Sequence, residues 1–275
     1  MKLPATYLFV PGNRPERFAK ALASGADAVI LDLEDAVAPH DKDDARVNIR
    51  HWAEAHPDLA AKVVVRINDG ATPWFRSDLE LFSQSGMRLA MLPKVETPEA
   101  IGIVRSALPA EGRVLPIIES ARGVDNANAI AAAYGVQRLV FGTLDYGVDL
   151  NLSGDDRGIA YAASRMAIAS RCAGLAAPVA GITAAIDDDA RLAADLEFAR
   201  AFGFGAKLCI HPRQLAAIDA AFRPSAAEVD WARRVVAAAA GTSGAFVVDG
   251  RMVDRPVVLK AQSILDRAAP STAAP

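Results

Sequence analysis

Short apolar runs, each ended by a polar residue or a turn, recur along the chain. They fall at residues 7–10, 28–33, 63–67, 89–92, 115–118, 138–141, 177–182 and 205–210. Continuous apolar runs of this length are typical of parallel strands that are buried on both faces. We therefore expect eight short strands, of which the run at 177–182 has the weakest pattern.

Segments with helical spacing separate these runs. Phe18, Ala21 and Leu22 recur at helical intervals before Gly25, and Val47, Ile49 and Trp52 do so in the next segment. The expected helices begin near residue 14, cover 42–61 and 75–85, begin again at 97–99, and cover 124–134, 158–173 and 188–202. The alternation predicts an α/β fold, a (β/α)₈ TIM barrel, over residues 1–222. An open doubly wound sheet is disfavoured because no glycine-rich dinucleotide fingerprint follows the first strand.

The remaining residues, 223–275, have a different pattern. A helix is expected over 226–240, a hairpin over 246–253 and a last helix over 256–267. This C-terminal helix-hairpin-helix extension is predicted to pack on the barrel or on an oligomer interface.

Composition narrows the class of protein. The 275 residues are 52% hydrophobic and 23% charged, with a formal net charge of -3 and a pI of about 5.8. Such a chain has no global basic field for nucleic acid or for an anionic membrane, and no apolar run approaches the ~20 residues that span a bilayer. Cys172 and Cys209 lack metal or disulfide spacing, and the N-terminus does not resemble a signal peptide. We expect a cytoplasmic protein that acts on a small molecule.

The polar groups at the predicted strand ends are the main candidates for chemistry. They are Glu34, Asp35, Arg66, Lys94, Glu96, Glu119, Asp145, Lys207 and His211. In a parallel barrel all strands end at the same face, so these side chains are expected to meet there. So many acids beside one arginine in a single mouth require a cation or a substrate to balance them.

Carboxylates without a histidine or thiolate cluster favour Mg²⁺. Glu119 and Asp145 are the predicted direct ligands, because each follows an apolar run. The alternative is that each is a solvated acid at a helix N-terminus, and spacing alone does not decide between the two. Arg66 offers a planar fork for a substrate carboxylate, or pairs with Glu34 or Asp35. These two roles of Arg66 are compatible.

Three further basic residues follow the first strand. Arg14, Arg17 and Lys20 would either bind the phosphates of a cofactor or form a solvated helix face. For Lys207 and His211 a structural role is the simpler interpretation, as a rim lysine and as the residue that turns the chain before Pro212.

Taken together, the motifs resemble the citrate lyase β-subunit-like family of the HpcH/HpaI aldolase and citrate lyase superfamily. They are Phe9-Val10-Pro11-Gly12 with Arg14-Pro15-Glu16-Arg17-Phe18, Leu31-Asp32-Leu33-Glu34-Asp35-Ala36-Val37, Val65-Arg66-Ile67-Asn68, Leu92-Pro93-Lys94-Val95-Glu96, Ile118-Glu119-Ser120-Ala121-Arg122-Gly123 and Cys209-Ile210-His211-Pro212. The segment from Arg233 to Pro256 also resembles this family.

The resemblance implies a Mg²⁺-dependent barrel enzyme, a homotrimer or a multiple of one, that cleaves or forms carbon–carbon bonds in acyl-CoA thioesters. It implies Glu119 and Asp145 as metal ligands, and Arg66, with Glu119, at the substrate carboxylate. Glu34 and Asp35 correspond to acids that orient the waters of the metal. Related pyruvate aldolases have a histidine base where this chain has Asp35, which favours the lyase branch.

One position departs from the family pattern. Members often have Gly-x-Glu-Asp after the sixth strand, whereas this chain has Gly142, Thr143, Leu144 and Asp145. The expected reaction is cleavage of a 3-hydroxyacyl-CoA of the citryl-CoA or malyl-CoA type, with Asp35, Glu34, a metal-bound water or a group from a neighbouring subunit as base. The alternatives are a pyruvate-type class II aldolase without CoA and a non-catalytic protein that binds a keto acid or acyl-CoA.

Overall fold

The computed structural model describes residues 3–241 and 244–268. The chain divides into two compact units, one formed by Pro4–Ile218 and the other by the residues from Asp219 onward together with Leu3. Each unit is built around its own group of buried apolar side chains.

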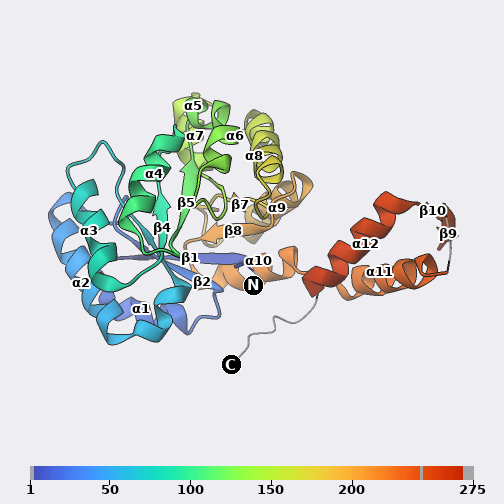
Figure 1. Cartoon of the computed structure of the whole chain (residues 1–275), viewed down its shortest axis with the longest axis horizontal. Coiled ribbons are helices and arrows are strands. Elements are labelled where there is room, and N and C mark those ends of the chain that lie inside the picture. The colour runs from blue at the N-terminus through green and yellow to red at the C-terminus, as the bar shows by residue number, and fades with distance from the viewer. Residues whose placement is uncertain (1–2, 242–243, 269–275) are drawn as a thin grey trace. The chain divides into compact units, whose positions relative to one another are not determined.

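The first unit contains a closed parallel barrel (Figure 1). Its strands are β1 (Thr6–Pro11), β2 (Ala28–Asp32), β3 (Val63–Arg66), β4 (Leu89–Leu92), β5 (Arg113–Ile118), β6 (Val140–Phe141), β7 (Val179–Ala180) and β8 (Ala206–Cys209). The barrel closes through β1, where Tyr7 pairs with Ala28 of β2 on one side and with Leu208 of β8 on the other. The predicted (β/α)₈ fold is confirmed.

Alternate residues of each strand fill the barrel interior. The buried core includes Ile30, Val64, Met91, Leu115 and Val140, one from each of five strands in succession. Because side chains alternate across a strand, the next residue along points outward to the helices. Phe141 follows this rule, since its ring packs against Tyr146 and Phe204 rather than into the barrel core.

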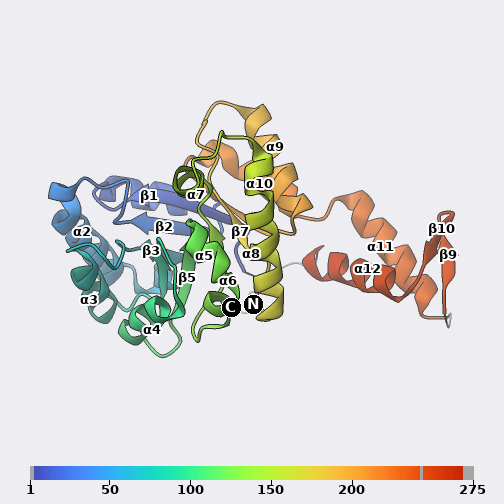
Figure 2. The same cartoon turned by 90° about the horizontal axis from the view of Figure 1, so that it is seen from above.

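Helices cover the outside of the strands (Figures 1 and 2). They are α1 (Phe18–Leu22), α2 (Lys42–Ala55), α3 (Phe75–Ser85), α4 (Pro98–Ala107), α5 (Ala121–Asp125), α6 (Ala127–Ala132), α7 (Thr143–Asp149), α8 (Ala160–Cys172), α9 (Asp189–Ala201) and α10 (Leu215–Phe222), with short 3₁₀ turns at Pro15–Arg17, Pro39–Asp41, Pro57–Lys62, Asp156–Ile159 and Pro212–Gln214.

Several expected boundaries were wrong. The helix predicted over 42–61 ends at Ala55, because Pro57 cannot continue it and a 3₁₀ turn follows. The helix predicted over 124–134 is two helices that meet at Asn126. The run at 177–182 forms only the two-residue β7, since Pro178 lacks a backbone donor. Two helices were not predicted from the sequence, α7, which contains Asp145, and α10.

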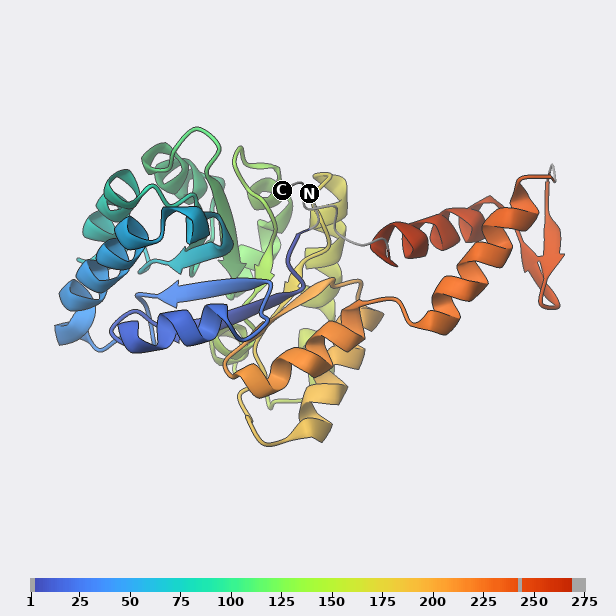
Figure 3. The ribbon, with the colours of Figure 1, turned by 90° about the horizontal axis from the view of Figure 1, so that it is seen from below.

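The second unit is a pair of helices joined by a hairpin (Figure 3). Its elements are α11 (Ala226–Ala239), β9 (Phe246–Val248), β10 (Arg251–Val253) and α12 (Arg255–Ala268). Ser225 caps α11 through a capping box with Glu228. Ala232, Val235 and Ile264 pack between the two helices. Within the described part of the chain, no helix has the length and apolar character required to cross a membrane.

Candidate active site

Arg66 occupies the C-terminal end of β3 and is held by acids from β2. In the strand register Arg66 lies beside Asp32. Its Nε donates to Asp32 Oδ1 and its Nη2 to Asp32 Oδ2, each at 2.6 Å, which is a bidentate pair. Its Nη1 lies 2.7 Å from Glu34 Oε2 and 3.9 Å from Asp35 Oδ2. Although burial opposes the charge, the Asp32 carboxylate raises the pKa of Arg66, so the guanidinium stays charged.

Asp32 is a site residue that sequence reasoning missed. Its side chain is fully buried, and besides Arg66 it accepts hydrogen bonds from the backbone N–H groups of Glu34 and Ala36. The signal was present, because an acid interrupts the apolar run at residues 28–33. The buried Asp32 carboxylate therefore holds both the backbone of the turn after β2 and the guanidinium of Arg66 in position.

Lys94, which follows β4 at Pro93, bridges two of the predicted acids. Its backbone N–H donates to Glu119 Oε1 at 2.7 Å, and its Nζ donates to Glu34 Oε1 at 2.8 Å. The backbone of Lys94 is left-handed, with φ of 52°. A non-glycine residue is strained in this region. Its conformation directs the amide to one acid while the side chain reaches the other.

Glu119 follows the last residue of β5 and is 6% exposed. Burial, together with the Asp145 and Glu34 carboxylates, raises the pKa of Glu119 to about 8. The hydrogen bond from the Lys94 amide acts in the opposite direction and lowers this pKa. The next residue, Ser120, fixes the start of α5 by accepting a hydrogen bond from the N–H of Gly123 at 3.1 Å. Glu119 therefore stands at a rigid corner, in an environment that requires a cation for the ionised form.

Asp145 lies in the first turn of α7, four residues after Phe141, the last residue of β6. The chain reaches it through Gly142, where a Cβ atom would collide with the side chain of Glu119. Only glycine lets the backbone approach the acid so closely. The structure thus brings Glu119 and Asp145 together.

The donor set of this pair suits a hard divalent cation. Mg²⁺ is commonly bound by one or two carboxylates and keeps its other positions for water and substrate. Among the described residues no group of three or more His, Cys, Asp or Glu side chains could hold a metal ion. A closed site of the zinc type is therefore absent from the described part of the chain, and an open two-carboxylate site fits.

The three basic residues after β1 are exposed. Arg14 Nε donates to Glu16 Oε1 at 2.6 Å, and Arg17 Nε is 3.9 Å from the same oxygen. Lys20 lies on α1, one turn further along. Their carboxylate neighbour is itself exposed, so it is a weak competitor for these cations.

Lys207 was expected on the rim of the barrel, and this expectation was wrong. It is 3% exposed, within β8, and its Nζ donates to the carbonyl oxygen of Gly181 at 2.6 Å. Alternation explains the difference, since Ala206 and Leu208 face the barrel core and Lys207 therefore points outward. His211 accepts a hydrogen bond from the backbone N–H of Arg213 at 3.2 Å and caps the 3₁₀ turn there, as its expected structural role requires.

The family described as HpcH/HpaI aldolase/citrate lyase matches residues 5–212. The chain belongs to this family. The match covers β1 to β8 and every candidate residue named above, and it confirms the resemblance found in the sequence.

Relatives extend the similarity over nearly the whole chain. A citrate lyase subunit beta-like protein of Mycobacterium tuberculosis is 38% identical over 97% of this chain and 96% of its own length. The citrate lyase subunit beta of Leuconostoc mesenteroides is 33% identical over 96% and 93% of the two chains. A (3S)-malyl-CoA thioesterase of Cereibacter sphaeroides is also 33% identical, over 95% and 93%.

Solved structures of the family agree with this fold. The CitE protein of M. tuberculosis in complex with magnesium, acetoacetate and coenzyme A has a TM-score of 0.83 at 35% identity, covering 96% of this chain and 98% of that one. The same protein with magnesium and pyruvate has a TM-score of 0.75 at 32% identity, covering 95% and 98%. Both are family members crystallised with magnesium.

Proposed function

We propose that this family member is a Mg²⁺-dependent carbon–carbon lyase that cleaves a 3-hydroxyacyl-CoA thioester of the citryl-CoA or malyl-CoA type into a keto acid and an acyl-CoA. The observation that carries the proposal is the pair formed by the buried Glu119 and the exposed Asp145, next to Glu34, which itself pairs with the Arg66 guanidinium. CitE bound to magnesium, acetoacetate and coenzyme A supports it.

Glu119 and Asp145 would hold Mg²⁺, which when bound supplies a Lewis acid for the oxygen of the keto acid. Arg66 orients the substrate carboxylate. The Asp32 carboxylate holds the planar guanidinium in one orientation. The Nη1 atom of Arg66 pairs with Glu34 and lies 3.9 Å from Asp35. A positioned guanidinium lowers the barrier by fixing the reacting bond in place.

Asp35 takes the proton of the substrate hydroxyl in this proposal. Its carboxylate is 65% exposed, and its distance of 3.9 Å from Arg66 leaves it free to accept a proton. Glu34 is less available, because Lys94 and Arg66 both bind it. As the bond between the two carbons breaks, its electron pair passes to the thioester as an enolate, which is then protonated. The Asp35→Asn variant should therefore lose more activity than it loses keto-acid binding.

The phosphates of coenzyme A are assigned to Arg14, Arg17 and Lys20. These residues follow β1 at the end of the barrel where the acids collect, and they are exposed. Charge reversal of two of them, Arg17→Glu with Lys20→Glu, should raise the KM for the CoA ester and leave the affinity for the free keto acid unchanged.

A thioesterase is the second candidate, because the (3S)-malyl-CoA thioesterases of C. sphaeroides are 33% identical to this chain. The two reactions differ in their products. A lyase releases a keto acid and an acyl-CoA, whereas a thioesterase releases a hydroxy acid and free CoA.

The test uses purified protein with (3S)-malyl-CoA and citryl-CoA, with and without Mg²⁺. Keto acid is measured as its phenylhydrazone, acetyl-CoA by chromatography and free thiol with a disulfide dye. Mg²⁺-dependent keto acid without free thiol supports the lyase, and free thiol without keto acid supports the thioesterase. Absence of both products, with Glu119→Gln leaving Mg²⁺ affinity unchanged, would refute the proposal.

A further inference from the structure

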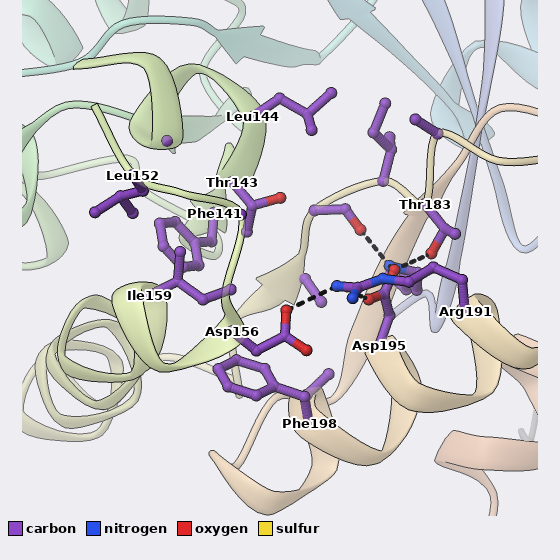
Figure 4. Close-up of a pocket in the computed structure, with 18 of the residues that line it drawn as sticks. Phe141, Thr143, Leu144, Leu152, Asp156, Ile159, Thr183, Arg191, Asp195 and Phe198 are labelled. Atoms are coloured by element: carbon purple, nitrogen blue, oxygen red, sulfur yellow. Dashed lines mark hydrogen bonds and ion pairs between the residues drawn. The ribbon is translucent and has the colours of Figure 1, made fainter. Parts of the chain in front are cut away.

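A cavity of about 670 Å³ lies beside the barrel, between α7, the loop after it, the loop after β7 and α9 (Figure 4). Apolar side chains make up most of its wall, among them Phe141, Leu152, Ile159 and Phe198. Its size and lining are those of sites that bury a small organic molecule. Neither the acid pair nor Arg66 lines it, so it is separate from the site described above.

Helix α7 stands between the cavity and the acid pair. Thr143, Leu144, Gly147 and Val148 line the cavity and share one face of the helix. Asp145 lies on the opposite face, where its carboxylate acts on Glu119. A ligand in the cavity would therefore lie behind the helix that carries Asp145.

Lys207 places a buried ammonium in the wall of the cavity. It is 3% exposed, and burial lowers its pKa to about 8. Its Nζ donates to Gly181 at 2.6 Å, while the carboxylate of Asp195 is 3.9 Å away, beyond hydrogen-bond distance. An ammonium has three donors. Within the described residues, two of those donors have no acceptor.

The other charges of the cavity are already balanced. Arg191 lies 2.7 Å from Asp156 and 2.6 Å from Asp195, as the dashed lines in Figure 4 indicate. Asp195 also accepts a hydrogen bond from the buried hydroxyl of Thr183. Of the two cations that line the cavity among the described residues, Arg191 is paired with two carboxylates, whereas Lys207 keeps hydrogen-bond donors for a ligand. A second anionic group on that ligand would therefore meet no cation with such donors.

We propose that this cavity binds a monocarboxylate with an apolar body, whose carboxylate accepts hydrogen bonds from Lys207 and whose hydrocarbon packs against the aromatic side chains. This ligand class differs from the di- and tricarboxylic acyl groups assigned to the acid pair. The site does not depend on the reaction proposed above.

Calorimetry with aliphatic acids tests the site on the full-length protein. Hexanoate should bind, and butanoate should bind about fifteenfold more weakly, because each buried methylene contributes about fourfold in affinity. Succinate, which has two carboxylates and a short body, should not compete. Lys207→Met should weaken hexanoate binding at least tenfold.

Two tryptophan variants make the test independent of Lys207. Ala184 is exposed and lines the cavity, so Ala184→Trp should block hexanoate. Ala190 is exposed on α9 and does not line it, so Ala190→Trp should bind hexanoate normally. Arg66→Met should also leave hexanoate binding unchanged. Failure of hexanoate to bind at millimolar concentration, or loss of binding in Arg66→Met with retention in Ala184→Trp, would overturn the proposal.

Discussion

The backbone amide of Lys94 donates a 2.7 Å hydrogen bond to Glu119 from a left-handed conformation, with φ of 52°. Backbone strain of this kind costs about 1–2 kcal/mol, and here it leaves the Lys94 Nζ free to bind Glu34. The strain therefore connects Glu119, the proposed metal ligand, to the acids around Arg66. Of the three non-glycine residues with positive φ in the described part of the chain, Lys94, Asn151 and Asp249, only Lys94 lies at the candidate site, which supports a functional origin of its strain.

The first prediction concerns this strain. Lys94→Ala and Lys94→Gly both remove the ammonium from Glu34, but only glycine adopts a positive φ without cost. We expect the glycine variant to be more stable than the alanine variant by about 1 kcal/mol. Urea unfolding of the two variants measures the difference. Equal midpoints would mean that the backbone of Lys94 is not strained.

The second prediction concerns Gly142. A methyl group at this position would collide with the Glu119 carboxylate, so Gly142→Ala should displace that acid and weaken Mg²⁺ binding at least tenfold. Gly147→Ala is the matched control, because a Cβ atom there meets nothing within 4 Å. Mg²⁺ titration calorimetry compares the two variants. Comparable Mg²⁺ affinity in both would remove Glu119 from the proposed metal site.

The barrel was predictable because its strands are nearly all apolar and its helices are amphipathic. The acids were predictable as strand-end residues, since parallel strands end at one face. The role of Asp32 was not predictable, because an acid inside an apolar run has no visible partner in the sequence. Only the strand register places Arg66 beside it. The position of Lys207 was predicted wrongly for a related reason. Side-chain alternation along a strand shows that neighbouring residues point to opposite faces, but it does not show which residue points into the core.

The third prediction concerns the pair of Asp32 and Arg66. Asp32→Asn keeps the shape of the side chain but removes the charge that balances a buried guanidinium. Breaking such a pair costs about 3–5 kcal/mol, and the remaining contact of Arg66 with Glu34 keeps the expected loss near the lower limit. Guanidinium chloride unfolding measures this loss.

A double variant separates pair formation from packing. Combining Asp32→Asn with Arg66→Met removes both charges and should recover part of the lost stability. Strict additivity of the two single changes would contradict the assignment of Asp32 as the balancing charge.

The fourth prediction concerns pH and Lys207. Burial lowers its pKa to about 8 in the folded state from 10.5 when exposed, so between these values the unfolded chain binds more protons. Stability contributed by this site must therefore rise with pH across that window, because deprotonation relieves the cost of a buried charge. Below pH 8 that cost is present in full.

Lys207→Met provides the reference, because it cannot titrate. The stability of the native protein relative to this variant should rise by about 3 kcal/mol between pH 8 and 10.5. The groups that face the ammonium are Asp195, Arg191 and Cys209. Burial raises the pKa of Cys209 to about 12, outside the window, and hydrogen bonding to Asp156 keeps the pKa of Arg191 above its usual value. Unfolding curves at half-unit intervals would detect the rise, and a constant difference would show that burial does not lower the pKa of Lys207.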